Sequence, residues 1–254
     1  MDQTVANGHF ARKQLFSPSR LISWSHRRRF EMGLQLIGDV AGKQILDFGC
    51  GDATFLVLLT DQGRAPAEAV GAEIDPRTID DNNQRLRDRP GLRFVLQKEL
   101  DLATYDQRFD WVICMEVCEH LVKLDGVLDL FRRVLRPGGR LMVSVPVETG
   151  LPLLVKQASR RIAGWRGIGD YRFNARYSIC ELWKSVGAGD SQHMERPVYK
   201  HLDGTPFHDH KGFNWRVLRE KIRAGFRLDA VHASPVSSFP PQWNSQAWML
   251  ATRL

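Results

Sequence analysis

The stretch Lys43–Leu59, with the sequence KQILDFGCGDATFLVLL, decides the fold that the rest of the chain is expected to adopt. Its apolar run Gln44–Phe48 is followed by the turn Gly49-Cys50-Gly51 and then by a second apolar run without a helix breaker. This order predicts a buried parallel strand, a glycine turn and a helix that begins over the carboxyl end of the strand. Glycine suits such a turn because a side chain there would hold the backbone away from whatever lies opposite.

A second predicted strand adds a carboxylate to the same edge of the sheet. Ala69–Ile74 is apolar except for Glu73, which lies slightly beyond the roughly 20 residues at which nucleotide-binding folds place a ribose-binding acid. A carboxylate there can accept hydrogen bonds from both ribose hydroxyls. The third glycine of the dinucleotide pattern G-x-G-x-x-G is absent, so the turn lacks a pyrophosphate cradle. We interpret the two strand ends as a site for a nucleoside without a phosphate.

The motifs D-F-G-C-G-D at 47–52 and G-A-E-I-D at 71–75 resemble those of class I S-adenosylmethionine methyltransferases. The resemblance covers 43–146 well and the rest of the chain more loosely. It implies an α/β, Rossmann-like fold with a seven-stranded, mostly parallel sheet and helices on both faces, and it implies S-adenosyl-L-methionine as cofactor. The residues that the resemblance assigns to this cofactor are Asp47, Gly49, Cys50, Gly51, Glu73, Ile74, Met115, Glu116 and Val117.

The adenine contact is less well marked. The family often places an acid directly after the third strand, which is expected here at Leu92–Gln97. Lys98 stands at that position, with Glu99 next and Asp101 beyond. The contact to the adenine amino group therefore stays open among these residues, and Lys98 and Glu99 are kept as candidates.

The second half of the expected sheet follows a similar order. The strand Phe109–Met115 leads to a helix at Leu124–Leu135, which the sequence Arg-Pro-Gly-Gly at 136–139 should end before the strand Arg140–Pro146. Two further strands are expected at Arg227–Ala233 and Gln246–Arg253.

The residues after the fourth strand carry the predicted chemistry. Glu116, Glu119 and His120 are three and four residues apart, so on a helix they would share one face. A solvated start of a helix and an acid–base or metal site both fit this pattern. Without a metal, His120 is the natural general base.

The motif E-x-x-E-H-L resembles the ubiquinone-biosynthesis O-methyltransferases, the UbiG type, and more distantly the small-RNA 2′-O-methyltransferases. In those families the two glutamates and the histidine help to bind a divalent cation beside the reacting hydroxyl. The resemblance therefore implies catalytic roles for Glu116, Glu119 and His120, and Mg²⁺ as a second cofactor that lowers the pKa of the hydroxyl.

A histidine-containing segment near the C-terminus extends this resemblance. The sequence GTPFHDHKGF at 204–213 is similar to the G-T-H-D-x-K-x-F segment of the UbiG type, with Pro206-Phe207 inserted. In that type the histidine approaches the E-x-x-E-H group, which implies His208 as a fourth metal-binding residue. Because of the insertion His210 stays an alternative, as do two surface histidines without a role.

The segment 151–166 is expected to form an amphipathic helix. One face carries Leu151, Leu154, Val155, Ala158, Ile162 and Trp165, and the other carries Lys156, Arg160, Arg161 and Arg166. The pattern is typical of an interfacial helix, although a helix packed over the active site as a lid fits as well. The UbiG type has an apolar insertion at this point that contributes to membrane association. That resemblance favours a lipid-facing lid on an anionic membrane surface.

Composition sets wider bounds on the protein. A chain of 254 residues with 43% hydrophobic and 26% charged residues fits one globular domain with decorations. The net charge of +7 favours anionic surfaces or partners. Four cysteines without a C-x-x-C spacing, and no stretch of 18 apolar residues, favour a cytoplasmic protein, peripheral at most on the inner face of a membrane.

We expect residues 1–40 to form a helical lid or extension, and 41–254 a methyltransferase domain with an amphipathic insertion at about 149–207. The helix expected at Arg28–Leu36 would pack on the edge of the core, close over the cofactor, or do both.

The function expected from these motifs is methyl transfer to a small-molecule or lipid-like acceptor, most consistently at a hydroxyl. One alternative is an RNA 2′-O-methyltransferase, but no RNA-binding module is recognisable, so nucleic acid is not the expected partner. Another is a protein that binds S-adenosylmethionine without catalysis. The acceptor, the methylated atom and the oligomeric state stay open.

Overall fold

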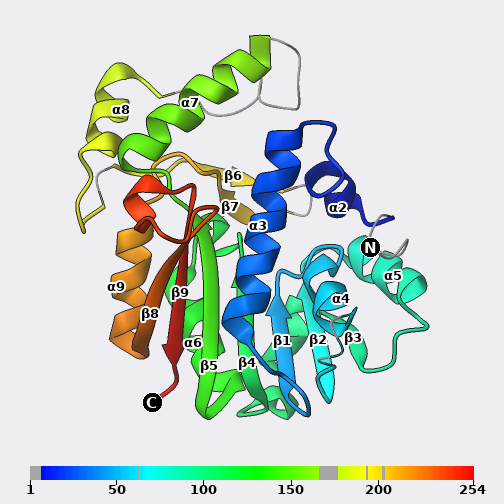
Figure 1. Ribbon diagram of the computed structural model, residues 1–254. Helices are drawn as coiled ribbons and strands as arrows, with labels where there is room; N and C mark the ends of the chain where they lie inside the picture. The colour runs from blue at the N-terminus through cyan, green and yellow to red at the C-terminus, as the bar shows by residue number, and fades with distance from the viewer. Residues whose placement is uncertain (1–6, 62, 64, 166–176, 193, 202–203) are drawn as a thin grey trace.

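The computed structural model describes residues 7–61, 63, 65–161, 165, 177–192, 194–201 and 204–254 in full, and the backbone of 162–164. These residues form a seven-stranded sheet in the order β3-β2-β1-β4-β5-β9-β8 (Figure 1). The strands are β1 Gln44–Phe48, β2 Glu68–Glu73, β3 Leu92–Leu96, β4 Phe109–Met115, β5 Leu135–Pro146, β8 Arg227–Ser234 and β9 Gln246–Thr252.

The pairing confirms the predicted, mostly parallel sheet. Strands β1 to β5 pair in parallel, and β9 runs antiparallel between β5 and β8. The strand order reverses between β1 and β4, because the chain leaves β1 toward β2 and leaves β4 toward β5. In open α/β sheets such a reversal opens a crevice outside the carboxyl ends of the strands, and ligands bind there.

Helices cover both faces of the sheet (Figure 1). They are α3 Arg20–Ile37, α4 Thr54–Asp61, α5 Pro76–Arg85, α6 Leu124–Val134 and α9 Trp215–Gly225. Successive side chains of a strand point to opposite faces, so each strand contributes to two separate cores. In β1, Ile45 belongs to the core beneath α3 and α4, whereas Leu46 and Phe48 belong to the core beneath α6 and α9.

The N-terminal residues form more helix than expected. A short helix, α2 at His9–Gln14, precedes α3, which begins at Arg20 rather than at Arg28. The C-terminal half of α3 is buried against the sheet, whereas its first half exposes Leu21 and Trp24. The carboxylate of Asp52 accepts a hydrogen bond from the backbone N–H of Ala11 at 2.8 Å, so α2 is tied to the glycine turn. The N-terminus thus packs on the core and also lies over that turn.

One expected turn lies inside a strand. Helix α6 ends at Val134, and Leu135 already pairs with Phe109 before pairing resumes at Arg140 and Trp111. The four residues between them, 136–139, form a bulge in which Gly138 adopts a φ of 74°. Strand β5 therefore starts five residues earlier than the expected Arg140, because Leu135 extends the ladder before the glycines turn the chain.

The described residues of the segment 149–207 cover the carboxyl end of the sheet (Figure 1). The segment contains α7 Gly150–Trp165, α8 Ile179–Val186 and β6 Val198–Lys200, which pairs with β7 Pro206–His208 as an antiparallel hairpin. These two strands were not identified from the sequence. Among the described helices, none is long and apolar enough to cross a lipid bilayer.

Helix α7 forms as predicted, but two residues of its basic face, Lys156 and Arg160, are turned inward, whereas Arg161 is exposed. Lys156 and Arg160 both pair with the fully buried carboxylate of Glu148, at 3.1 and 3.0 Å. The ammonium of Lys156 also donates to the backbone carbonyls of residues 147 and 245. Leu151 and Val155, in contrast, are exposed. Arg166 and the side chain of Ile162 lie outside the described residues.

We predict that Glu148→Gln lowers the free energy of unfolding by about 3 kcal/mol at neutral pH, because it leaves two cations without their buried partner. Burial alone would raise the pKa of Glu148, but Lys156 and Arg160 lower it to about 2. The carboxylate therefore stabilises the fold above its ordinary pKa of 4.5, and this contribution disappears as the pH falls from 4.5 toward 2.

Urea denaturation between pH 3 and pH 7 tests this prediction. The difference between Glu148→Gln and the wild type should shrink as the pH falls. Glu31→Gln is the matched control, because Glu31 pairs with Arg28 on the exposed surface and should cost less than about 1 kcal/mol. Equal losses for both variants would contradict a buried ion group at Glu148.

Candidate functional site

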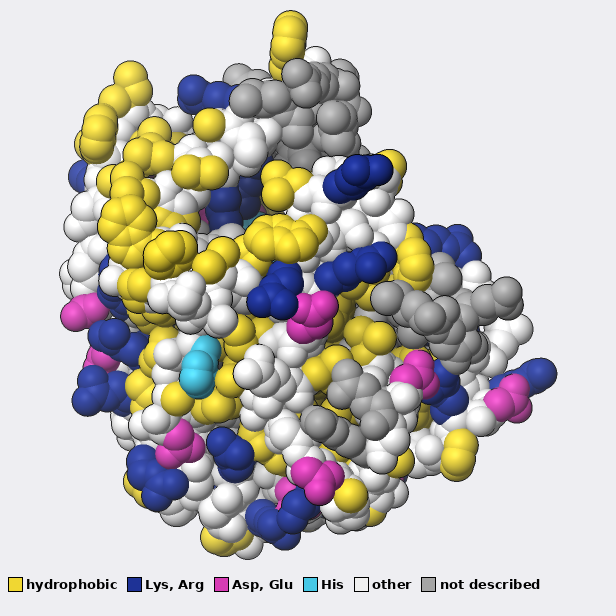
Figure 2. Space-filling model, viewed as in Figure 1, with side chains coloured by type: hydrophobic (Ala, Val, Ile, Leu, Met, Phe, Trp, Pro, Cys, Tyr) yellow, Lys and Arg dark blue, Asp and Glu magenta, His cyan; other side chains and the backbone are white. Residues whose placement is uncertain are grey.

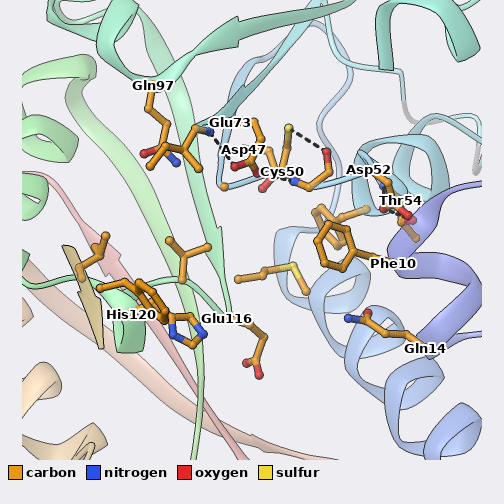
Figure 3. Close-up of a pocket in the computed structure, with 18 of the residues that line it drawn as sticks. Phe10, Gln14, Asp47, Cys50, Asp52, Thr54, Glu73, Gln97, Glu116 and His120 are labelled. Atoms are coloured by element: carbon orange, nitrogen blue, oxygen red, sulfur yellow. Dashed lines mark hydrogen bonds between the residues drawn. The ribbon is translucent and has the colours of Figure 1, made fainter. Parts of the chain in front are cut away.

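A cavity of about 510 Å³ opens at the point where the strand order reverses. Its walls come from the glycine turn, the carboxyl ends of β1, β2 and β4, the N-terminal helices and the hairpin β6–β7. Figure 3 shows Asp47 and Glu73 in one part of this cavity, and Glu116 and His120 in another. The cavity therefore joins the two groups of polar residues that the sequence analysis singled out.

The glycine turn has no room for side chains. Gly49 has a φ of 76°, and a Cβ on it would lie 2.4 Å from the side chain of Val117. The backbone N–H of Gly51 donates to one oxygen of Glu73 at 3.0 Å, and that of Ile74 donates to the other at 2.6 Å. These two bonds fix the Glu73 carboxylate at the end of β2, where its remaining lone pairs can accept hydroxyl groups.

Asp47 is a buried carboxylate at the end of β1, beside this turn. Its burial raises its pKa to about 7, and the negative charge of Glu73 contributes. A carboxyl group with such a pKa is readily ionised by a cationic ligand, because the ligand's charge favours the carboxylate form.

Nearly all of the predicted cofactor residues line the cavity. They are Asp47, Gly49, Cys50, Gly51, Glu73, Ile74, Met115, Glu116 and Val117. Lys98 and Glu99 do not, because β3 ends at Leu96 and the 3₁₀ helix η1, Gln97–Asp101, follows directly. The Glu99 carboxylate accepts the backbone N–H of Leu96 at 2.9 Å, and Gln97 lines the cavity instead. From the sequence, β3 was expected to end at Gln97. An end at Leu96 would have placed Gln97 directly after the strand, where the family often contacts the adenine.

The N-terminal helices bring residues that the sequence analysis missed. Phe10, Gln14, Arg29 and Phe30 all line the cavity. Arg29 is buried, donates to the side-chain oxygen of Gln14 at 2.6 Å, and lies 3.7 Å from the Glu116 carboxylate. Its Nε has no hydrogen-bond partner among the described residues. Burial lowers the pKa of Arg29, and a buried guanidinium with a free donor is suited to bind a carboxylate.

The E-x-x-E-H motif does not form the expected α-helix. Glu116 adopts a φ of 58°, and the 3₁₀ helix η3, Cys118–His120, follows it. The two carboxylates therefore lie in different surroundings. Glu116 accepts a hydrogen bond from Ser144 at 3.2 Å, whereas Glu119 is fully buried and neither of its oxygens has a partner among the described residues. Burial raises the pKa of Glu119, and the charge of Glu116 adds to this.

His120 presents a free nitrogen to the site. Its Nδ1 lies 2.7 Å from the backbone carbonyl of His208, and a carbonyl can only accept, so Nδ1 carries the proton. Burial lowers the pKa of His120, so the ring is neutral near pH 7 and Nε2 holds a lone pair. This Nε2 lies 3.8 Å from the Glu119 carboxylate. His120 can thus take up a proton or bind a metal.

His210, and not His208, joins this group. The ring of His208 bonds through Nδ1 to the backbone carbonyl of Pro197 at 2.8 Å. The ring of His210 lies 4.9 Å from that of His120, and its buried Nδ1 has no described partner. Burial lowers the pKa of His210 to about 4. The inserted Pro206-Phe207 lies in β7 and shifts which histidine reaches His120.

Glu119, His120 and His210 are the described residues whose ligand atoms converge, all within 4.8 Å of one another. The predicted metal residues Glu116 and His208 are not part of this group. Both side-chain oxygens of Glu119 and the Nδ1 of His210 are buried without a described hydrogen-bond partner. Buried polar atoms normally have partners, so these three atoms fit a bound cation. Two imidazoles and one carboxylate suit Zn²⁺ or Mn²⁺ better than Mg²⁺, which prefers oxygen ligands.

Comparisons with known proteins agree with this arrangement. Residues 39–196 match the family described as a methyltransferase domain. The chain is 28% identical to the ubiquinone biosynthesis O-methyltransferase of Mesorhizobium japonicum over 199 residues, which is 75% of this chain and 77% of the relative. It is 34% identical to a probable phthiotriol/phenolphthiotriol dimycocerosates methyltransferase 2 of Mycobacterium ulcerans, over 65% of this chain and 60% of that protein.

Several further ubiquinone biosynthesis O-methyltransferases match over about half of their own length. Among solved structures, geranyl diphosphate C-methyltransferase from Streptomyces coelicolor, in complex with S-adenosyl-L-homocysteine, shares the fold with a TM-score of 0.57. The identity is 13%, and the match covers 100% of this chain and 88% of that one. With the family match spanning more than half of the sequence, the chain belongs to the methyltransferase-domain family and is an S-adenosylmethionine-dependent methyltransferase.

Proposed function

We propose that this enzyme methylates a hydroxyl group of a small-molecule or lipid-like acceptor. The observation that supports it is the neutral imidazole of His120, whose Nε2 lone pair is free and which lines the same cavity as the glycine turn. A hydroxyl is a weak nucleophile until its proton is taken, and a positioned imidazole performs this step near neutral pH. O-methylation is therefore the chemistry that this group serves best.

The other cavity residues fit the bound cofactor. Glu73 would accept the ribose hydroxyls, Asp47 would face the positively charged methionine part, and Gln97 would reach the adenine. Arg29, with its free Nε, would bind the methionine carboxylate. When bound, S-adenosyl-L-methionine supplies an electrophilic methyl group on a sulfonium.

The protein's remaining task is to position the acceptor and to exclude water. Val117, Leu121 and Phe207 form an apolar wall next to His120. Leu121, directly after η3, forms an antiparallel β-bridge with Phe207 of β7. The N-terminal helices to about residue 40 and the insertion at 149–207 act as lids on this cavity. An acceptor with a large apolar part fits such a wall. Two relatives are named for ubiquinone biosynthesis and for phthiotriol/phenolphthiotriol dimycocerosates, and these names support the same class of acceptor.

A divalent metal at Glu119, His120 and His210 is the second candidate for hydroxyl activation. Both side-chain oxygens of Glu119 and the Nδ1 of His210 are buried without described hydrogen-bond partners, and the ligand atoms of the three residues lie within 4.8 Å of one another, which favours such a site. A metal there would supply a Lewis acid beside the cavity that favours the ionised hydroxyl. Only His120 of the three lines the cavity itself, so Glu119 and His210 would hold the ion from behind.

The outer surface of the insertion supports a lipid-like acceptor. Helix α7 contacts α8 and the 3₁₀ helix η5, Pro241–Trp243, so their exposed residues form one surface, visible as the yellow region at the upper left of Figure 2. Its exposed apolar residues are Leu151, Val155, Ile179, Trp183, Phe239 and Trp243.

This surface is the outer side of the helix whose basic residues are buried on Glu148. Tryptophans on an exposed apolar face are typical of the membrane–water interface. The net charge of +7 favours anionic lipids. We propose that an anionic bilayer covers this face, so that the acceptor reaches the cavity from the membrane. Two of the basic residues of α7, Lys156 and Arg160, pair with Glu148 on the inner side of the helix and are not available to bind RNA.

The pKa of Asp47 predicts a pH-dependent cofactor affinity. Asp47 is protonated below about pH 7 in the free enzyme, and the cationic cofactor requires the carboxylate. Affinity measured by calorimetry should therefore fall roughly tenfold per unit as the pH drops below 6. Asp47→Asn should bind more weakly at pH 8 and lose this dependence. An unchanged slope in the variant would remove Asp47 from the cofactor site.

His120→Gln should lower the rate of methyl transfer by about 10²–10⁴-fold, while the affinity for S-adenosylmethionine stays within about twofold. Mass spectrometry of methyl ether formed on a long-chain alkyl catechol in phospholipid vesicles measures this rate. His208→Gln is the matched control, because it keeps the backbone carbonyl that orients His120.

The same reaction separates the two ways of activating the hydroxyl. If the enzyme is active in the presence of a chelator and added Mn²⁺ does not change the rate, His120 alone removes the proton of the acceptor hydroxyl. Activity that returns only with Mn²⁺ would support the metal. Methylation at nitrogen or carbon, or full activity of His120→Gln, would contradict the proposal.

Binding to the membrane is tested with anionic vesicles containing phosphatidylserine. Val155→Asp together with Trp183→Asp should reduce sedimentation with these vesicles at least tenfold, because two charges must then enter the interface. Leu254→Asp is the control, since Leu254 is also an exposed apolar residue but lies at the opposite end of the molecule (Figure 1). Unchanged binding of the double variant would remove the membrane from the proposal.

A further inference from the structure

We propose that Arg196 is a positioning residue that holds His120 and His210 in one group; this rests on the function proposed for that group. The guanidinium of Arg196 lies between two segments that are distant in sequence. Its Nη2 donates to the backbone carbonyl of Glu119 at 2.5 Å and to that of Asp209 at 2.6 Å. One nitrogen therefore joins the turn after β4 to the loop after β7.

The two accepting carbonyls are those next to the histidines. The carbonyl of Glu119 belongs to the peptide unit that continues into His120, and the carbonyl of Asp209 belongs to the one that continues into His210. Fixing both peptides from one nitrogen fixes the origins of both side chains. The ring separation of 4.9 Å therefore depends on where Arg196 holds these two peptides.

Arginine suits this task because of its shape. The Nε of Arg196 also donates to the carbonyl of Lys211 at 3.4 Å, and the guanidinium lies 5.2 Å from the centre of the Phe213 ring. A planar fork with fixed donor directions can hold carbonyls from several peptides at once, whereas the ammonium of lysine is a point charge on a flexible chain. Bonds from a charged donor are also stronger than neutral ones.

The two segments also meet through other contacts between described residues. They share the bridge between Leu121 and Phe207 and the bond from His120 Nδ1 to the carbonyl of His208, and both of these lie before Asp209 in the chain. The insertion also holds the His210 loop: Gln192 and the hydroxyl of Tyr177 both bond to Gly212, and Lys211 pairs with Glu181 at 2.9 Å. Without Arg196 the loop would keep its place on the insertion but lose its register with the turn that carries His120.

The first measurement is the nuclear Overhauser effect between the rings of His120 and His210, in protein labelled with ¹³C-histidine and assigned with His120→Gln and His210→Gln. The cross-peak should be present in the wild type and lost in Arg196→Met. Arg216→Met is the matched control, because Arg216 also donates to a loop carbonyl, that of Ala188 at 3.0 Å, and lies 5.1 Å from the Trp215 ring. It is not part of the histidine group and should keep the cross-peak.

The second measurement is the affinity for Mn²⁺ alone, which should fall by about 10–100-fold in Arg196→Met and not in Arg216→Met. Thermal melting and S-adenosylmethionine affinity report whether each variant is folded. If Arg196→Met does not fold, Arg196→Lys replaces it. That variant keeps the charge without the fork, so it should show a weakened cross-peak and an intermediate Mn²⁺ affinity.

Two results would overturn the proposal: a cross-peak and Mn²⁺ affinity of wild-type strength in a folded Arg196 variant, or a wild-type protein that lacks the cross-peak. A wild-type protein that shows the cross-peak but binds no Mn²⁺ would refute the metal site, and the cross-peak in the Arg196 variants would still decide the role of Arg196.

Discussion

The close approach of two turns at the carboxyl edge of the sheet is the constraint on which the site depends. Gly49 follows β1 and Val117 follows β4, and a Cβ at Gly49 would lie 2.4 Å from Val117. The two strands are neighbours, so the turns must share one small space. Glycine on one side lets the other carry the E-x-x-E-H motif directly against the glycine turn. Asp47 and Glu73, proposed to bind the cofactor, therefore line the same cavity as Glu116 and His120 of the motif.

The insertion shows how buried charge can determine which way a helix faces. Lys156 and Arg160 are drawn inward because Glu148, directly after β5, is fully buried and needs partners. Lys156 and Arg160 occupy the inner side of α7 together with the buried Leu153, so Leu151 and Val155 face outward. An isolated globular protein gains nothing from that orientation, since exposed apolar area costs free energy. The arrangement becomes favourable when a lipid surface covers the helix.

The seven strands of the main sheet were predictable from the sequence because each apolar run is local, whereas the hairpin β6–β7 was not. The glycine turn and Glu73 were predictable for the same reason. Other features depend on contacts between distant segments. No local signal marks Arg29 as the buried member of the run Arg27-Arg28-Arg29, and its partner Gln14 lies on another helix. The helical spacing of Glu116 and His120 was misleading, because Glu116 adopts a left-handed backbone conformation that spacing does not reveal.

The two glutamates of the motif illustrate how the fold assigns different roles to identical side chains. Glu116 meets the guanidinium of Arg29 and the hydroxyl of Ser144, so its charge is balanced within the cavity wall. Glu119, three residues later, is fully buried without a hydrogen-bond donor among the described residues, and burial raises its pKa. A carboxylate in such a place is costly unless a cation or a proton joins it. The adjacent His120 and His210 can supply either, by binding a metal with Glu119 or by sharing the proton taken from the acceptor. The lack of a hydrogen-bond donor for Glu119 among the described residues is therefore the feature that supports the chemistry proposed for this corner of the fold.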